Sequence, residues 1–401
     1  MDLRADLLEH LRAEPATRAV LDAVAGRRDV HLVGGSVRDA LLWAAPRDLD
    51  FAVEGDALEV AVAVGERLGG EVLEHDRFGT ARVSVTAHSY DFASARAERY
   101  ARPGALPEVR PATLADDLRR RDFTVNAIAL AAGGPHAGTL TAAPEALDDL
   151  DARRLRVLHD DSFLDDPTRL LRLGRYAARL GFAVEPHTAE LARAAIAGGS
   201  LGTVSGSRIG QELRLAALEA KPVAAFERLV SLGVLRALHP RFGPHTEFTR
   251  RALVAIPPDG RADLVVLAAC APDVPHSLLD RLGFDREEAR LAAALADRLP
   301  EVARRLASAQ RPSEIDAALA GSTAEEAALV AALGSAEAVA RWLGDLRRVA
   351  LEIDGADLRA AGVPEGPAIG AALASTRAGR LDGDLMTREA QLAFALRMAG
   401  T

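Results

Sequence analysis

The sequence predicts an α+β protein in which a small mixed β-sheet, with helices packed against it, is followed by an all-helical remainder. Short apolar or alternating stretches, bounded by glycines and charged residues, recur between residues 29 and 93 and are typical of strands. From about residue 183 onward, apolar residues recur at helical spacing. A chain of 401 residues is too long for one ordinary core. We therefore expect a head over 1–150, a helical neck over 151–240, and a helical body and tail over 241–401.

The composition narrows the class of protein. With 49% hydrophobic and 27% charged residues, and no apolar run of membrane-spanning length, the chain is expected to be soluble and globular. A net charge of -9 argues against a protein that coats nucleic acid through bulk charge. Cys270 is the only cysteine, which excludes an internal disulfide and any zinc site built from several cysteines. Because the N-terminus lacks an apolar export segment, we expect a cytoplasmic location.

The stretch from residue 29 to residue 54 carries the strongest signals in the head. Residues 29–33 form an apolar run that predicts a strand ending in a turn at Gly34-Gly35. Ser36 is a plausible N-cap for a short helix over 37–43. Residues 48–53 then alternate between charged and apolar side chains, as in a half-buried strand.

This alternation brings two carboxylates together. Asp48 and Asp50 are two residues apart in the predicted strand, so their side chains point to the same face. Two close carboxylates repel each other unless a cation lies between them or one is protonated, and hard oxygen ligands suit Mg²⁺. The glycine pair upstream would let backbone N–H groups approach a phosphate at a helix N-terminus. The alternative is a turn followed by an exposed strand with two solvated aspartates.

The rest of the head reads as further short elements. Asp91 lies on the last of the predicted strands, where it could join the first two carboxylates. Residues 95–109 contain prolines and a glycine among charged residues and predict a loop. The remaining predictions are a helix over 56–68, strands over 71–75, 80–86 and 89–93, and a connector over 133–147.

Residues 117–130 form the second motif, which we interpret as an amphipathic helix that opens with three arginines, 119–121. Arginine forks match phosphate oxygens in bidentate geometry. Asp122 and Asn126 are four residues apart and would share one face of a helix, where they could hydrogen-bond a ribose. An ordinary charged helix start is the alternative.

Residues 165–182 form the third motif and predict a helix with Pro167 in its first turn and Asp165 or Asp166 as its cap. A carboxylate and a forked arginine can imitate a Watson–Crick partner. A solvated basic helix edge is the alternative. The basic edge consists of Arg169, Arg172, Arg175 and Arg179.

Taken in order, GGSVRD, DLDF, RRDFTVNA and DDPTR resemble the signature motifs of the class II tRNA nucleotidyltransferase and bacterial poly(A) polymerase family. The resemblance implies a polymerase beta-like head followed by an α-helical neck, body and tail. It also implies that Asp48 and Asp50 are catalytic and hold two Mg²⁺ ions, with Asp91 as a candidate third ligand. It assigns nucleotide binding to Gly34, Gly35, Arg38, Arg121, Asp122, Asn126, Asp166, Arg169, Arg172 and Arg175. Within that set, Asp166 and Arg169 would select the base.

Two departures from the family pattern are visible. Asp165 stands where the family usually has Glu, which puts its orienting role in doubt. In SGSRI, Ser207 also replaces the usual Glu, so that only Arg208 carries over as a residue expected to contact RNA.

The function implied by the resemblance is template-independent addition of CCA, or part of it, to tRNA 3′ ends from CTP and/or ATP, with release of pyrophosphate. The alternatives within the family are an enzyme that adds only A and a poly(A) polymerase. The loop over 95–109 resembles a flexible loop implicated in the switch to the final adenylate. Outside the family, the alternatives are an inactive RNA-binding module and a helical scaffold. Neither a membrane nor a protein partner is implied.

Overall fold

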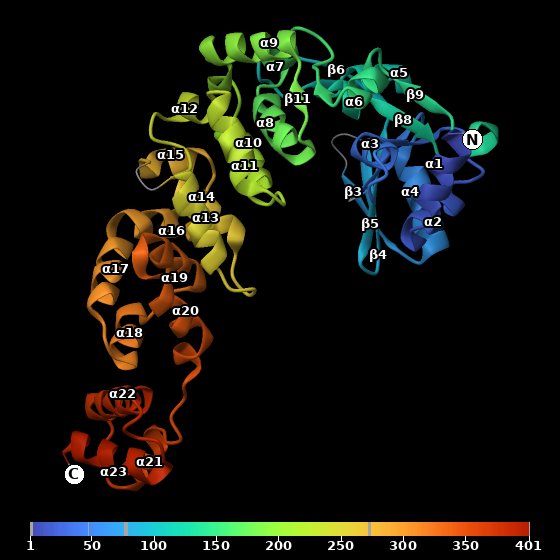
Figure 1. The fold of residues 1–401 in the computed structure, drawn as a ribbon. Helices are drawn as coiled ribbons and strands as arrows, with labels where there is room; N and C mark the ends of the chain where they lie inside the picture. Colours follow the sequence, from blue (N-terminus) through green and yellow to red (C-terminus); the bar gives the residue numbers. More distant parts are fainter. Residues whose placement is uncertain (1–2, 47, 76–78, 272–273, 401) are drawn as a thin grey trace. The chain divides into compact units, whose positions relative to one another are not determined.

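The computed structural model describes residues 3–46, 48–75, 79–271 and 274–400. The chain divides into two compact units (Figure 1). Unit 1 comprises residues 1–205 and 232–237, and unit 2 comprises residues 206–231 and 238–401. All strands of the described chain lie in unit 1, whereas unit 2 is helical, so the predicted α+β class is confirmed. The boundaries expected near residues 150 and 240 stay predictions.

Unit 1 is built on a seven-stranded mixed sheet with the order β3-β4-β5-β2-β1-β8-β9. Only the β2–β5 pair is parallel among the pairs of this sheet in the described chain. The strands are β1 (Val30–Val33), β2 (Leu49–Val53), β3 (Glu71–His75), β4 (Thr80–Val85), β5 (His88–Ser94), β8 (Ile128–Ala131) and β9 (Leu140–Ala142). The predicted strands over 29–93 are thus confirmed in type and order.

Helices surround this sheet and continue beyond it. Helix α4 packs on β3, β4 and β5, while α3 packs against β1, β2 and β8. The helices of unit 1 are α1 (Leu3–Arg12), α2 (Pro15–Ala23), α3 (Gly35–Leu41), α4 (Ala57–Leu68), α5 (Leu114–Arg119), η1 (Thr124–Asn126), η2 (Gly134–His136), α6 (Ala146–Asp151), α7 (Ser162–Asp165), α8 (Thr168–Leu180), α9 (Pro186–Ala197), η3 (Ser200–Gly202) and most of α12 (Val234–Leu238). A short parallel pair, β10 (Arg154–Leu155) with β11 (Ala183–Val184), flanks α8.

The central strands β2 and β5 have one buried and one open face. Phe51 and Phe92 are paired in register and stack with ring centroids 4.9 Å apart. Both rings are buried, which anchors the two strands to the core. Because side chains alternate along a strand, the residues one position earlier, Asp50 and Asp91, are directed away from this core.

The prediction of one helix over 117–130 is wrong beyond the first turn of that helix. Helix α5 ends at Arg119, η1 follows, and residues 128–131 form β8 between β1 and β9. All four residues of β8 are buried. A short apolar run of this kind fits a buried strand as well as a helix, and pairing with β1 decides in favour of the strand.

Three smaller predictions also fail. The expected loop over 95–109 contains β6 (Arg96–Arg99), which pairs with β7 (Glu108–Pro111) in a two-stranded ribbon. The expected connector over 133–147 contains η2, β9 and the start of α6. The N-cap of α3 is Gly34 rather than Ser36, because the Ser36 hydroxyl lies inside the helix and donates to the Val33 carbonyl.

Unit 2 consists of packed helices. Its larger core gathers apolar side chains from α13 to η5, and a smaller cluster joins α21, α22 and α23. Cys270, the last residue of α14, is fully buried and free. The elements are α10 (Gly206–Ala217), α11 (Pro222–Ser231), α13 (Thr246–Ala255), α14 (Ala262–Cys270), α15 (His276–Arg281), α16 (Arg286–Asp297), α17 (Leu299–Ser308), α18 (Pro312–Leu319), α19 (Ala324–Val330), η4 (Ala331–Ser335), α20 (Ala336–Gly344), η5 (Leu346–Arg348), α21 (Gly355–Ala360), α22 (Pro367–Leu381) and α23 (Arg388–Ala399).

In the part of the chain that the structure describes, one helical stretch, Ala324–Arg348, is long and apolar enough to cross a membrane by length and composition alone. Half of its apolar window is buried inside the protein, and many of its side chains belong to the larger core of unit 2. The stretch is also interrupted at Gly334, whose φ of 129° is not helical. These features are those of a core helix.

Candidate active site

The first part of the site is the open face of β2. Asp48 and Asp50 are exposed, whereas Leu49 between them and Phe51 after them are buried. Asp50 is exposed as a residue, but the surrounding protein still removes part of the water from its carboxyl group. This burial, together with the charges of Asp91 and Asp48, raises the pKa of Asp50 to about 6 against the opposing effect of Arg121. The two carboxyl groups of the DLD sequence therefore lie on one face and repel each other.

A third carboxylate lies next to Asp50 in the sheet. Asp91 pairs in register with Asp50 on one side and with Arg82 on the other. Both of its oxygens accept hydrogen bonds from Arg82, at 2.7 and 2.8 Å. Asp91 is therefore placed where the sequence suggested a third metal ligand, but a guanidinium already neutralises it.

The glycine corner lies beside these carboxylates. Gly34 caps α3 with φ 69°, a conformation that side chains rarely adopt. A Cβ atom at this position would also stand 2.8 Å from a terminal guanidinium nitrogen of Arg121. The backbone N–H of Asp50 donates to the Ser36 hydroxyl at 3.3 Å, which links the start of α3 to β2. Gly34, Arg121 and Asp50 thus belong to one region of unit 1.

The predicted ribose residues form a continuous network. Arg38 donates to the Asn126 side-chain oxygen at 2.5 Å, and the Asn126 amide donates to Asp122 at 2.9 Å. Asp122 in turn accepts from Arg172 at 2.8 Å. Arg38 is only 1% exposed and also contacts Asp39, so in this structure it braces Asn126 behind the glycine corner. Its expected contact with a triphosphate stays a prediction.

Tyr176, a residue of α8, is at the centre of this network. Its ring has three guanidinium groups at 5.2–5.4 Å from the centroid, those of Arg38, Arg172 and Arg175. Its hydroxyl accepts from Arg172 at 3.3 Å. The sequence gives no sign of this role, because Arg38 comes from α3, far from Tyr176 along the chain.

Helix α8 begins at Thr168 with Pro167 as its N-cap residue, so the predicted cap at Asp165 or Asp166 is wrong by one or two residues. Asp166 accepts from the Thr168 backbone N–H and hydroxyl, at 3.0 and 2.6 Å. Arg169 is buried, donating to Ser162 and to the Arg120 carbonyl at 2.7 and 2.6 Å. Burial raises the pKa of Asp165, which lies beside a cavity of about 220 Å³ next to Arg169. In this structure Asp166 thus bonds within the start of α8, and Arg169 links α8 to Ser162 and to the end of α5. The contact of this expected base-reading pair with a base stays a prediction. Arg208 lies in unit 2, on α10.

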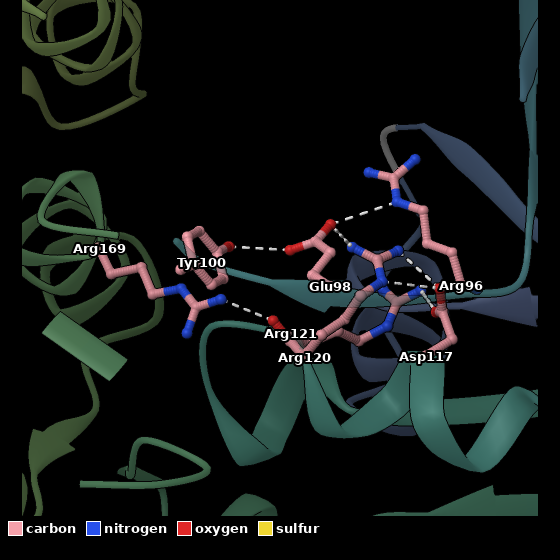
Figure 2. Close-up of polar contacts among 7 residues, drawn as sticks. All are labelled: Arg96, Glu98, Tyr100, Asp117, Arg120, Arg121 and Arg169. Carbon is pink, nitrogen blue, oxygen red and sulfur yellow. Dashed lines mark hydrogen bonds and ion pairs between the residues drawn. The ribbon is translucent and has the colours of Figure 1, made fainter. Parts of the chain in front are cut away.

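Figure 2 shows a further polar cluster that the sequence did not reveal. The Tyr100 hydroxyl donates to Glu98 at 2.8 Å, and Glu98 accepts from Arg120 at 2.9 Å. Asp117 accepts from both Arg120 and Arg121. The only signal in the sequence was Asp117 four residues before Arg121, a spacing that brings side chains together on a helix.

An open carboxylate pair beside a glycine-capped helix start, on a mixed sheet followed by helices, defines a polymerase-type nucleotidyltransferase. Residues 30–156 match the family model described as "Poly A polymerase head domain". Residues 181–244 match the model described as "Probable RNA and SrmB- binding site of polymerase A". The chain is 34% identical to the A-adding tRNA nucleotidyltransferase of Geobacter sulfurreducens, over 92% of this chain and 45% of that protein. It is 35% identical to the CC-adding tRNA nucleotidyltransferase of Deinococcus radiodurans, over 71% of this chain and 76% of that protein.

The structural comparison agrees. The Thermotoga maritima CCA-adding enzyme complexed with tRNA_CCA superposes with a TM-score of 0.78 at 28% identity, covering 99% of this chain and 98% of that one. The chain belongs to the tRNA nucleotidyltransferase family, and the resemblance seen in its motifs is confirmed. It spans about half the length, or less, of several curated relatives that it matches.

Proposed function

We propose that the protein adds nucleotides from CTP and/or ATP to the 3′ end of tRNA, completing all or part of CCA with release of pyrophosphate. The observation that carries the proposal is the open face of β2, where Asp48 and Asp50 lie beside the Arg121 guanidinium at the glycine corner. Carboxylates and a cation beside an accessible backbone turn are the groups that a metal-bound triphosphate requires. We place this activity in the cytoplasm, where tRNA is processed.

The donor set fits Mg²⁺. The pKa of Asp50 is raised first by burial and then by the charges of Asp91 and Asp48, and a divalent cation would offset these effects. Among the residues that the structure describes, no group of three or more His, Cys, Asp or Glu residues is arranged to hold a metal by itself. Asp48 and Asp50 would therefore share the ion with oxygens of the substrate, which is how Mg²⁺ is usually bound in such sites. Two bound Mg²⁺ ions would stabilise charge on the attacking 3′-oxygen and on the departing pyrophosphate.

The residues of the chain would bind and orient the reactants. Arg121 would hold the phosphates, and the Asp122–Asn126 pair would orient the ribose. The 3′-hydroxyl oxygen of tRNA then bonds to the α-phosphorus, its proton leaves to solvent, and the bond to pyrophosphate breaks. The reaction needs no oxidant and no covalent enzyme intermediate.

The test uses tRNAs that end before the first C, before the second C and before the A, each incubated with CTP or ATP alone. Extension of one or more of these ends with release of pyrophosphate is the expected result, and Asp50→Ala serves as the inactive control. An absence of Mg²⁺-dependent pyrophosphate release with every combination would instead indicate an inactive RNA-binding module.

A second candidate is an enzyme that adds only A. This candidate is favoured by the alignment with the A-adding enzyme of Geobacter sulfurreducens, which extends over 92% of the chain. In the same assay it would extend only the tRNA that lacks the final A, and only with ATP. A poly(A) polymerase would instead add many adenylates to an RNA that lacks a tRNA fold.

A further inference from the structure

Asp117 is a buried carboxylate whose two oxygens serve two different arginines. Its side chain is only 1% exposed. One oxygen accepts from Arg120 at 2.6 and 2.9 Å, and the other accepts from Arg121 at 2.8 Å (Figure 2). Burial alone would raise the pKa of Asp117, but the two guanidinium charges outweigh it and lower the pKa. Asp117 is therefore ionised, and its two oxygens serve these two side chains. The oxygen that accepts from Arg120 also accepts from the Arg96 backbone N–H, at 3.4 Å.

The two arginines are held differently. Arg120 is shared, because it also donates to Glu98 at 2.9 Å. Arg121 has no second tether: among the described residues, Asp117 is the only side chain with which its guanidinium forms a hydrogen bond or an ion pair. The Nε atom of Arg121 is buried without a hydrogen-bond partner in that part of the chain. The direction of the Arg121 guanidinium thus depends on Asp117.

The far end of Arg121 reaches the site. One of its terminal nitrogens is so close to Gly34 that a Cβ atom at that position would be only 2.8 Å from it. Its positive charge also opposes the rise in the pKa of Asp50. Arg121 therefore extends from a buried carboxylate on α5 to the glycine corner and the carboxylates of β2.

We propose that Asp117 is a positioning residue for nucleotide binding, which holds the Arg121 guanidinium at the Gly34 corner in the direction of the phosphates of the incoming nucleoside triphosphate. The inference rests on the proposed function, since it assumes that a triphosphate binds at this corner. Asp117 itself touches no reactant, because it is buried behind both arginines.

The experiment measures dissociation constants by calorimetry, with the α,β-methylene analogues of ATP and CTP as probes and with tRNA as a second ligand. Asp117→Asn keeps the shape of the side chain but removes its charge, so we expect about a tenfold weaker affinity for the analogue, since a charge-assisted hydrogen bond no longer orients Arg121. Affinity for tRNA should change less than twofold. Arg121→Ala should weaken analogue binding by a similar factor, and the double variant should be no weaker than Arg121→Ala alone.

Asp116→Asn is the matched control. Asp116 is the neighbouring residue on α5 and closes the capping box with Thr113, but it does not contact Arg121. It should bind the analogue like the wild type. Circular dichroism and thermal melting verify that each variant is folded. If Asp117→Asn is not folded, Asp117→Asn with Arg120→Met removes one charge of each sign and takes its place in the cycle.

The outcomes separate the two proposals. A wild-type protein that binds neither analogue overturns the proposed function and this inference together. A wild-type protein that binds an analogue, with Asp117→Asn unchanged, overturns the inference alone. The inference is also overturned if the losses of Asp117→Asn and Arg121→Ala multiply in the double variant, or if tRNA affinity falls in parallel, because Asp117 would then support the unit in general.

Discussion

Asp50 and Asp122 are the same amino acid in the same unit, yet their surroundings give them opposite properties. Asp50 lies on an open strand face, where burial of its carboxyl group and, after it, the charges of Asp91 and Asp48 raise its pKa to about 6. Asp122 is 8% exposed and accepts hydrogen bonds from Asn126 and Arg172. Burial alone would raise its pKa, but these partners outweigh that effect and lower it to about 2.

The difference separates a reactive group from a supporting one. A carboxylate whose charge is opposed by its neighbours gains most from a cation, so Asp50 is suited to bind a metal. A carboxylate that is already neutralised by an arginine has little to gain, so Asp122 is suited to hold other side chains in place. Asp91 lies between these extremes, because it neighbours Asp50 but is paired with Arg82.

The largest expected effect is on activity at Asp50. Asp50→Ala should reduce nucleotide incorporation at least about 1000-fold, roughly 4 kcal/mol of transition-state stabilisation, because a metal ligand is lost. Incorporation of labelled nucleotide into tRNA measures the loss, and a gel-shift titration should show tRNA binding largely intact. Turnover of Asp50→Ala near the wild-type rate would contradict the assignment of Asp50 as a metal ligand.

The next effect is on stability at Asp122. Asp122→Asn should lower the free energy of unfolding by about 2 kcal/mol, below the range for fully buried pairs because the Arg172 side chain is 30% exposed. Urea denaturation measures this change. Glu227→Gln, which breaks an exposed pair with Arg250, is the control and should have almost no effect. Equal stability of Asp122→Asn and the wild type would contradict a supporting role.

A substitution of Asp91 tests the residue whose surroundings are intermediate between those of Asp50 and Asp122. Asp91→Asn should reduce incorporation about tenfold, since the carboxylate is engaged by Arg82 but still shapes the field at Asp50. Steady-state kinetics of nucleotide addition measure the loss. A reduction as large as that of Asp50→Ala would instead make Asp91 a full metal ligand that exchanges Arg82 for the ion.

The smallest effect is on the pH dependence of stability without metal. The folded-state pKa of Asp50 is above its unfolded value, so its ionisation costs stability above pH 6 and costs nothing below pH 4. The free energy of unfolding of Asp50→Asn should therefore exceed that of the wild type by about 1 kcal/mol at pH 7, a figure discounted for solvent exposure, and equal it at pH 4.

Asp122 should show the opposite trend. Its folded-state pKa is depressed, so its contribution to stability is present above pH 4 and is lost towards pH 2. Melting temperatures between pH 2 and pH 8 measure both trends. A higher stability of the wild type than of Asp50→Asn at pH 7 would contradict the sign expected for Asp50.

Local patterns predicted the strands of the head and the paired position of Asp48 and Asp50, because the period of two in a strand is visible in the sequence itself. The same logic failed after Arg119, where a buried apolar run was assigned to a helix and forms β8 instead. A short buried apolar run has the same sequence pattern in a helix and in a strand, so the two cannot be distinguished until a partner strand is known. Family membership was recognisable because short motifs keep their order and spacing.

The contacts that the sequence could not predict depend on strand register and on the burial of side chains. The Arg82–Asp91 pair is set by the alignment of β4 with β5. The burial of Asp117, which is only 1% exposed, is likewise not visible in its local sequence. The burial of Arg38 and Arg169 also follows from tertiary packing. Arginines that a motif would assign to a ligand are here occupied by Asn126, Ser162 and a backbone carbonyl.

The single thiol of the chain has a practical consequence. Cys270 is enclosed in unit 2, and burial raises its pKa, so neither water nor an alkylating reagent reaches a reactive thiolate while the helices stay packed. The rate of labelling by such a reagent therefore reports the opening of unit 2 alone, in the intact chain and without any added probe. Substitutions in the head that leave this rate unchanged have left the helical half of the molecule undisturbed.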